Sequence, residues 1–349
     1  MIRNDRRRLL VGAGLGLLAG AASLAGARAA PGQTAKAPFS PAAGPRSRTI
    51  FVNDLSGDVD GLFAAVHQIL SPSTELRAIV GSGTGSAGET AERSTALATE
   101  ILELMGKPGR VAVHQGAAAK IKTPGVPVRS PGAQAIIDEA LRSDTTLPLY
   151  IGVGGGLTEV ASALMIEPRI AERFTLVWIG GDAYPGGGTG ETNFNIDRLA
   201  AQFIFNETKV RIWQVPRSVY ATCLVSATEL QAFVAPCGAI GEWLYRKVVE
   251  APAKYRNLLN MGETWTLGDN PVVLLTALTD WSPGTAASRP FKFERTGSSA
   301  SQTVAAPRLN PDGTFTPRPD GRAIRIFESV DTRMMMNDLF AKLRVNYGG

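Results

Sequence analysis

The sequence is poor in the residues that build zinc sites and disulfide frameworks. Its 349 residues include only two cysteines and two histidines. Cys223 and Cys237 lack metal-ligand spacing and neighbouring histidines, which excludes a zinc module. They either pair in an oxidising compartment or serve as two small buried hydrophobic residues. His67 falls within an apolar helical pattern and His114 at the end of a strand pattern, so both positions favour a structural role over a catalytic one.

The sequence also lacks a basic surplus once its first residues are set aside. The formal net charge is +5, but five arginines and one aspartate fall within residues 1–29. The remaining chain is therefore almost neutral and has no basic stripe, which excludes nucleic acid as a partner. No internal repeat is visible, so a solenoid is not expected.

The first 29 residues have the pattern of an export signal. Arg6, Arg7 and Arg8 precede a mildly apolar, glycine-rich stretch over residues 9–27, and Ala27-Arg28-Ala29 forms a small-residue cleavage site. The arginine pair is typical of the twin-arginine type, which predicts a periplasmic or secreted protein. The alternative is an uncleaved membrane anchor, because the apolar stretch is nearly long enough to span. Residues 30–46, rich in Pro, Ala, Gly and Ser, predict a flexible linker.

From residue 47 onward, apolar β-branched runs alternate with helical patterns. The expected strands cover residues 49–52, 76–80, 111–114, 147–153, 174–179, 210–215 and 323–327. The expected helices cover residues 62–70, 91–104, 133–141, 198–205 and 332–343, with another from residue 157. This rhythm predicts one α/β domain over residues 47–349, with a mostly parallel sheet covered by helices on both faces. Ligands are then expected at the carboxyl ends of the strands. Residues 282–322, rich in Gly, Ser and Pro, predict loops and short strands.

The most informative segment follows the first expected strand. Asn53, Asp54, Asp58 and Asp60 lie on one glycine-containing loop that opens a helix. Closely spaced carboxylates are ligands that a hard cation such as calcium prefers. The simpler alternative is capping of the helix by Asp58 or Asp60. Capping explains one aspartate, whereas three of them after a buried strand favour a metal.

This loop resembles the fingerprint of nucleoside hydrolases, Asp-x-Asp-Pro-Gly-x-Asp-Asp at the end of the first strand. The resemblance makes Asp54 the general base and a calcium ligand, with Val52 at the first Asp position and Asn53 able to take part of its role. The adjacent Asp pair of the family has no intact counterpart. Either Asp60 is the second calcium ligand, or Asp58 and Asp60 share metal binding and substrate binding.

A glycine cluster resembles a second landmark of the family, a turn that ends in Leu-Thr-Asn. Residues 153–159 read Val-Gly-Gly-Gly-Leu-Thr-Glu, and the resemblance implies that Gly154 offers its backbone carbonyl to calcium. Without the family, such a cluster indicates either a phosphate-binding turn or close packing of the backbone. The segment lacks the Lys and Ser/Thr order of a nucleotide P-loop, so phosphate is the minor alternative.

Asn193-Phe-Asn-Ile196 resembles the family's Glu-Phe-Asn-Ile segment, which holds the ribose. The resemblance implies that Asn193 and Asn195 bind substrate, with an amide where the family has a carboxylate. Glu191 is close enough in sequence to substitute for that carboxylate. The alternative is a turn followed by helix capping by Asp197.

Gly268-Asp269-Asn270-Pro271 resembles the family's His-Asp-Pro element. The resemblance makes Asp269 a calcium ligand, and it places Gly268 where the family has a histidine that contacts the leaving group. Trp265 either stacks on a base or closes the pocket, or it is a buried structural residue.

Together these resemblances, which run over residues 50–278, imply a calcium-dependent glycosidase that cleaves the N-glycosidic bond of nucleosides or related ribosides. The expected metal ligands are Asp54, Asp58, Asp60, Asp269 and the Gly154 carbonyl. Two alternatives share the fold, a hydrolase of another glycosidic substrate and a non-catalytic binder of sugars or nucleosides. The expected partner is a small molecule, with membrane contact only through the export signal; homo-oligomerisation is left open.

Overall fold

A computed structural model describes residues 38–188, 190–255, 262–279 and 299–348. The expected export signal and most of the linker lie outside these residues. Pro38–Gly349 is one compact unit, and its first strand begins at Ser47, where the domain was expected to start. Among the helices of the described ranges, none has the length and apolar character needed to cross a membrane.

The domain is organised around an eight-stranded sheet with the order β3-β2-β1-β4-β5-β6-β12-β9. Neighbouring strands are parallel except at the edge, where β9 runs antiparallel to β12. The strands are β1 (Ser47–Asn53), β2 (Thr74–Gly81), β3 (Ala112–Gln115), β4 (Leu149–Gly154), β5 (Phe174–Ile179), β6 (Arg211–Val215), β9 (Ala300–Ala305) and β12 (Ala323–Ser329). The expected mostly parallel α/β sheet is confirmed. From β1 the chain first adds strands on one side, up to β3, and then on the other side, from β4 onward. Sheets of this kind bind ligands at the point between the two sides, which here lies between β1 and β4.

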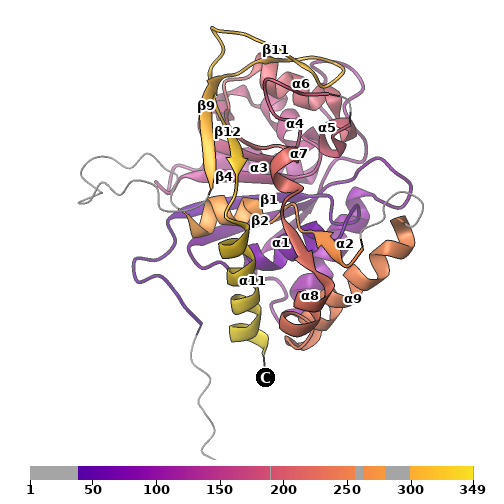
Figure 1. The fold of residues 1–349 in the computed structure, drawn as a ribbon. Coiled ribbons are helices and arrows are strands. Elements are labelled where there is room, and N and C mark those ends of the chain that lie inside the picture. Colours follow the sequence, from indigo (N-terminus) through magenta and orange to yellow (C-terminus); the bar gives the residue numbers. More distant parts are fainter. Residues whose placement is uncertain (1–37, 189, 256–261, 280–298, 349) are drawn as a thin grey trace, which may run out of the picture. The chain divides into compact units, whose positions relative to one another are not determined.

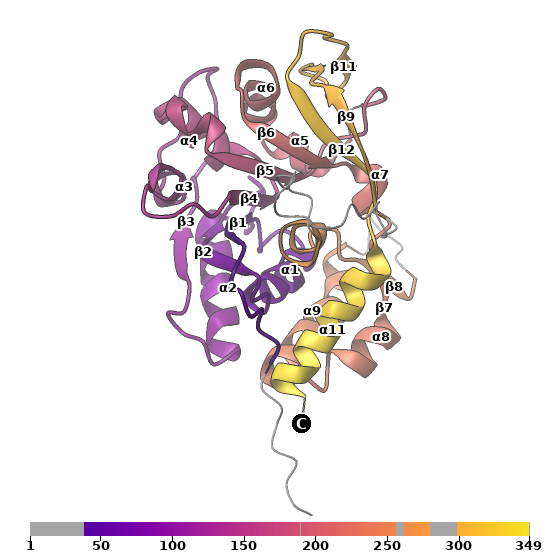
Figure 2. The same ribbon diagram turned by 90° about the vertical axis from the view of Figure 1, so that its left-hand side faces the viewer.

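Helices cover both faces of this sheet. Figure 2 shows α3 (Pro131–Leu141), α4 (Thr158–Ile166) and α6 (Arg198–Glu207) on one side, and α1 (Asp60–Ile69), α2 (Ala91–Leu104), α9 (Gly238–Tyr255) and α11 (Thr332–Tyr347) on the other. Successive residues of β1 point to opposite faces, so Phe51 belongs to one core cluster and Ile50 and Val52 to the other. The middle of a strand that is buried on both faces is expected to be apolar, as Ile50, Phe51 and Val52 are.

Shorter elements connect and extend these layers (Figure 1). The helical ones are η1 (Pro168–Glu172), α5 (Thr192–Ile196), α7 (Arg217–Tyr220), α8 (Ala227–Phe233), α10 (Pro271–Val273) and the π-helical turn η2 (Leu274–Leu278). Two small antiparallel pairs accompany them, β7 (Leu224–Ser226) with β8 (Thr264–Thr266) and β10 (Arg308–Leu309) with β11 (Phe315–Thr316). The loops and short strands expected within residues 282–322 are present where that range is described.

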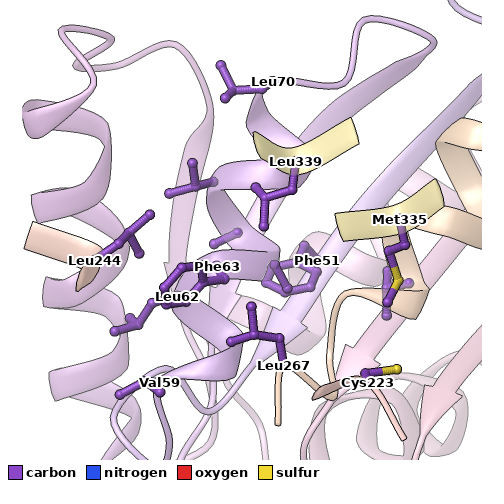
Figure 3. Close-up of a cluster of buried hydrophobic side chains, with 14 of the residues drawn as sticks. Phe51, Val59, Leu62, Phe63, Leu70, Cys223, Leu244, Leu267, Met335 and Leu339 are labelled. Carbon is purple, nitrogen blue, oxygen red and sulfur yellow. The ribbon is translucent and has the colours of Figure 1, made fainter. Parts of the chain in front are cut away.

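The core around α1 fixes the position of the loop that precedes this helix. Phe51 of β1 and Phe63 of α1 are fully buried, and Leu339 of α11 lies in the same cluster. Figure 3 shows these side chains close to one another, with Leu267 beside them. Burying side chains of this size contributes about 1.5–3 kcal/mol each. The loop between β1 and α1 is therefore anchored at both of its ends.

Candidate active site at the carboxyl edge of the sheet

A cavity of about 690 Å³ opens where β1 and β4 end. Asn53 and Gly154, the last residues of these two strands, are direct partners in the sheet. The cavity is lined by Asp54, Gly57, Asp58, Asp60, Thr84, Ser86, Glu89, Ile179, Gly190, Thr192, Asn193, Asn195, Ile196, Tyr220 and Asp269. The side chains predicted for the site thus come together from the β1–α1 loop, from α5 and from the turn before α10.

Three carboxyl groups form the inner part of this cavity. Burial raises the pKa of Asp54, Asp60 and Asp269, and the value for Asp269 is about 7. Asp269 is the strongest charged neighbour of both Asp54 and Asp60, and its charge raises their pKa further. The cause is physical, because like charges in a poorly solvated site disfavour ionisation. Such a cluster is stable as carboxylates only when a positive charge compensates it.

Asn53 and Gly154 contact the Asp269 carboxylate. The Asn53 amide Nδ2 donates to Asp269 Oδ2 at 2.7 Å, which partly offsets the rise in the pKa of Asp269. A side chain at Gly154 would collide with Asp269 and with Asn53, so only glycine lets these groups approach. The Gly154 carbonyl accepts the Asp54 N–H at 3.4 Å, which leaves it a second lone pair. Asn53 Oδ1 is buried without a hydrogen-bond partner.

Three glycines in and just after β4 allow close packing of the backbone. Gly152 abuts Val272 of α10, Gly154 abuts Asp269, and Gly156 abuts Ile196 of α5. A Cβ atom at any of these positions would overlap its neighbour. The glycines therefore let two chain segments with site residues lie directly on the strand backbone.

Asp58 and Asp60 are placed differently. Asp60 lies half-buried at the start of α1, and its Oδ1 accepts the Gly61 N–H at 2.9 Å. Asp58 is exposed at the rim, and its Oδ1 accepts the Val59 N–H. Asp60 is thus the closer companion of Asp54 and Asp269, although the charge of Asp58 acts on all three.

The side of the cavity formed by α5 carries the two predicted asparagines. Asn193 Nδ2 donates to the Ile179 carbonyl at 2.8 Å, and Asn195 Oδ1 accepts from Arg198 at 2.8 Å. Both residues line the cavity. The capping alternative also holds here, because Asp197 accepts the Ala200 N–H at the start of α6.

Glu191 does not face the cavity as a substitute for the family's carboxylate. It is 1% exposed and accepts four hydrogen bonds, from the N–H groups of Gly181, Asn193 and Phe194 and from the Tyr220 hydroxyl at 2.7 Å. A carboxylate with this many donors is fully engaged. Its function is to fix α5 and Tyr220 relative to the end of β5.

Tyr220 occupies the space next to Gly268. A Cβ atom at Gly268 would come within 3.1 Å of the Tyr220 ring and 3.2 Å of Asp60 Oδ2. Burial raises the pKa of the Tyr220 hydroxyl well above its usual range, and the charge of Glu191 adds to this. The proton therefore stays on the phenol and is donated to Glu191. Trp265 does not line the cavity and is 3% exposed in the core, which favours its structural interpretation.

The two histidines and the two cysteines do not line the cavity. His67 is fully buried, receives a hydrogen bond from the Asn270 amide at Nδ1 and donates from Nε2 to Asp338; burial lowers its pKa to about 4. His114 lies within β3 and does not line the cavity. Cys223 and Cys237 are buried free thiols, so the pairing alternative is not what the structure contains.

Glu89, Thr84, Ser86 and Tyr220 line the cavity but were not singled out in the sequence. Thr84, Ser86 and Glu89 lie on the loop after β2, and Thr84 Oγ1 donates to Glu89 Oε2 at 2.6 Å. The position of this loop at a strand carboxyl end was the available signal. Tyr220 follows a later strand, β6, and no motif marked it.

The donor chemistry of the inner carboxyl groups fits a hard divalent cation. Asp54, Asp60 and Asp269 offer only oxygen, carry like charge, and have no Lys or Arg among the residues that line the cavity. Within the described ranges, however, no three acidic, histidine or cysteine side chains are arranged closely enough to hold a metal. The residues therefore fit such an ion by charge and donor type, not as a formed coordination shell.

Solved nucleoside hydrolases share this fold. The purine-preferring ribonucleoside hydrolase from Gardnerella vaginalis is similar over 85% of this chain and 98% of its own, with a TM-score of 0.65 and 16% identity. The inosine-uridine preferring nucleoside hydrolase from Bacillus anthracis is similar over 86% of this chain and 99% of its own, with a TM-score of 0.60 and 14% identity. A plant nucleoside hydrolase is similar over 86% of this chain and 99% of its own, with a TM-score of 0.63 and 18% identity. At these identities the likeness shows the fold.

The sequence profile of the inosine-uridine preferring nucleoside hydrolase family matches residues 50–337, and the chain belongs to this family. The inosine-uridine preferring nucleoside hydrolase of Crithidia fasciculata is 44% identical over 64 residues, which is 18% of this chain and 19% of that relative. The alignment thus spans about a fifth of that curated relative. Members of the family are N-glycosidases, and membership places the chain among hydrolases of this kind.

Proposed function

We propose that this chain hydrolyses the N-glycosidic bond of nucleosides or related ribosides in a calcium-dependent reaction. The observation that carries the proposal is the convergence of Asp54, Asp60 and Asp269 in one cavity with Asn193 and Asn195. These residues come from three separate segments of the chain, and family membership independently supports N-glycosidase chemistry. Neither capping nor packing explains why buried like charges should gather there.

Asp54 is the proposed general base. It lies directly after β1 and lines the cavity, with its carboxyl group beside Gly155, where it can reach a water molecule at the substrate. It takes a proton from water as the water oxygen attacks the anomeric carbon. The C–N bond breaks at the same time through an oxocarbenium-like transition state, and the electron pair of that bond goes to the leaving nitrogen.

The other residues bind and orient. Asp54, Asp60, Asp269 and the Gly154 carbonyl would hold the cation, with Asp58 at the rim for the sugar or as a further ligand. Calcium, when bound, would supply a positive centre for the sugar hydroxyls and lower the pKa of the attacking water. Asn193 and Asn195 would orient the sugar by hydrogen bonds, since both are held by neighbouring groups. Such positioning lowers the entropic cost of reaching the transition state.

The proposal is tested with the mature chain, purified without metal and then assayed with calcium or with a chelator. The panel contains inosine, uridine, nitrophenyl riboside and glycosides of other sugars. Riboside hydrolysis that requires calcium supports the proposal. Hydrolysis restricted to other glycosides would replace it with the alternative substrate class, and ribose binding without any turnover would replace it with a non-catalytic binder.

We also propose that the chain is exported and cleaved after Ala29. The support is the arginine run at residues 6–8, the apolar stretch and the small residues at the cleavage site. Expression of the full chain, fractionation of the cells and N-terminal sequencing test this. A product in the periplasm or medium that begins at Ala30 is expected; an intact chain in the membrane would support the anchor alternative instead.

A further inference from the structure

His67 is a buried polar group that the proposed mechanism does not use. It lies on α1 and is fully buried. Its Nε2 atom donates to Asp338 of α11 at 2.8 Å, and its Nδ1 atom accepts from the Asn270 amide at 3.0 Å. Burying polar groups costs free energy even when they are paired, and an apolar side chain would fill this space without that cost. Packing alone therefore does not account for the polar chain from Asp338 through His67 to Asn270.

The direction of these hydrogen bonds is fixed from the α11 end. Asp338 forms an ion pair with Lys342, and a carboxylate only accepts hydrogen bonds. His67 therefore donates from Nε2, and because burial lowers its pKa to about 4, the neutral ring accepts at Nδ1. Asn270 has to present its Nδ2 group to the ring, which leaves its Oδ1 atom buried without a hydrogen-bond partner among the described residues. The imidazole thus decides which way the Asn270 amide faces.

Asn270 belongs to the turn that places Asp269 in the cavity. Asp269 directly precedes it and lines the cavity. Asn270 is fully buried, and its carbonyl accepts the N–H groups of Val273 and Leu274 at 2.9 and 3.2 Å. The turn is therefore held by the backbone of α10 on one side and by the Asn270 side chain on the other.

Two side-chain hydrogen bonds connect this turn to the segments that carry the other inner carboxyl groups. Asn53, the neighbour of Asp54, donates to Asp269 at 2.7 Å. His67 contacts the same turn from the helix that begins at Asp60. Within the described ranges these carboxyl groups do not yet form a metal-holding cluster. The relative placement of the three segments therefore decides how well the carboxylates can close on a cation.

We propose that His67 is a positioning residue for the cation site and acts through Asn270 on the Asp269 carboxylate. This inference rests on the proposed calcium-dependent function and adds a residue to it. Asp338 completes the chain by holding the imidazole in the required tautomer, in the way that outer groups orient the ligands of metal sites. His67 does not line the cavity, so it touches neither substrate nor cation.

Calcium affinity separates positioning from a purely structural role. In His67→Leu an apolar side chain replaces the imidazole, and the Asn270 amide loses its acceptor. Because the loss of an outer group weakens metal binding, we expect the calcium Kd of the folded variant to rise about tenfold in calorimetry. A purely structural role would lower the melting temperature in chelator and leave the calcium Kd unchanged, and that result would overturn the inference.

A double variant keeps the test valid if His67→Leu does not fold. His67→Leu combined with Asn270→Leu removes both polar groups, so the Asn270 amide is not left as a buried donor without an acceptor. We expect this variant to fold and to bind calcium with a similarly raised Kd, because the turn has lost its connection to α1. A native calcium Kd in the double variant would refute the inference.

Gln68→Leu is the matched control, at the next residue of α1. Gln68 is 1% exposed, and its amide donates to the hydroxyl of Thr74, the first residue of β2, at 2.8 Å. The control removes a buried hydrogen bond from the same helix without touching the Asn270 turn. We expect the free energy of unfolding to change and the calcium Kd to stay native. An equal rise of the Kd in Gln68→Leu and His67→Leu would show a general disturbance of α1 and would count against the inference.

Calcium binding by the native chain separates this inference from the proposed function. If the native chain binds calcium and the His67 variants bind it equally well, the inference fails and the cation site stands. If the native chain binds no calcium, the proposed cation site fails and the inference fails with it.

Discussion

Charged side chains lie near both ends of strand β1, and the two ends differ in how that charge is compensated. Near its start, Arg48 is 5% exposed and forms an ion pair with Glu139 at 2.6 Å. Arg77 and Arg142 also contact the Glu139 carboxylate, at 3.2 Å each. The Arg48 guanidinium additionally donates to the Leu147 and Glu139 carbonyls. The charged side chains at this end are therefore paired with opposite charge.

The other end of the same strand has charge of one sign only. The charge of Asp269 raises the pKa of both Asp54 and Asp60, and the Asn53 amide donates a hydrogen bond to the Asp269 carboxylate. Folding tolerates such an arrangement only at a cost in stability. The charge at the start of β1 is therefore paired within the structure, whereas the like charges beyond its other end lie in the candidate site, where we propose that a cation binds.

The largest expected effect comes from neutralising the functional end. Asp54→Asn keeps the size and a metal-capable oxygen but removes the base, so riboside turnover should fall about 10³-fold. Stability in chelator should be unchanged or higher, because one repelling charge has gone. Steady-state kinetics and thermal melting measure the two effects. Asp320→Asn, at an exposed loop position, serves as the control, and near-normal turnover of Asp54→Asn would show that the base is misassigned.

Removing the ion pair near the start of β1 should lower stability and leave turnover nearly unchanged. Arg48→Met leaves Glu139 buried with fewer partners and should lower the free energy of unfolding by about 3 kcal/mol. The half-exposed Arg77 is the matched control, and Arg77→Met should cost about 1 kcal/mol or less. Denaturant unfolding measures both, and the kcat of the folded fraction should stay near normal. A large loss of kcat in Arg48→Met would contradict the separation of the two ends.

Calcium should supply the missing charge at the functional end. Because binding to the folded state alone stabilises it, calcium at a hundred times its Kd should add about 2.7 kcal/mol to the free energy of unfolding. Melting curves with calcium and with chelator measure this directly. If the curves superimpose and elemental analysis finds no metal, the assignment of the inner carboxylates to a cation is wrong.

Glu159 provides a smaller test, because it is a buried carboxyl group outside the cavity. Burial raises its pKa from 4.5 to about 7, although the Ala117 N–H partly offsets this. The folded state thus holds a proton that the unfolded chain releases. Its contribution to stability is complete below about pH 4.5 and is lost as the pH rises to about 7.

Glu159→Gln should remove that part of the pH dependence, which is on the order of 3 kcal/mol. Unfolding measured across this pH range, with exposed Glu172→Gln as the control, tests the expectation. An unchanged slope would show that Glu159 is ionised in the folded protein. The result sharpens the comparison, because the raised pKa of Glu159 is caused mainly by burial, with a smaller contribution from Asp197, and no cation is proposed to bind there.

Much of the fold could be predicted because local patterns decide it. The expected strand over residues 174–179 coincides with β5, and the closing strand and helix correspond to β12 and α11. A strand buried on both faces leaves a continuous apolar run, which is readable without tertiary information. A short strand within residues 282–322 was expected, but the antiparallel place of β9 at the edge of the main sheet was not, since it depends on how the chain returns to β12.

Site residues were predictable where they directly follow a strand, as Asp54 does, or where a sequence motif marks them, as at Asp269. It was not predictable where partners come from distant segments. Glu191 is two residues from Asn193, yet its orientation is decided by Tyr220 and by the Gly181 N–H. The pairing of Arg48 with Glu139 likewise requires the fold, because 91 residues separate them.

The glycines at the end of β4 limit how this protein could be made more heat-resistant. Replacing glycine by alanine often stabilises proteins by reducing the freedom of the unfolded chain. At Gly152, Gly154 and Gly156 the added methyl group would overlap Val272, Asp269 or Ile196. Glycines with open space, such as Gly85 and Gly106, have positive φ angles that strain any other residue. Engineering for heat resistance therefore has to begin elsewhere, because these glycines are part of what shapes the site.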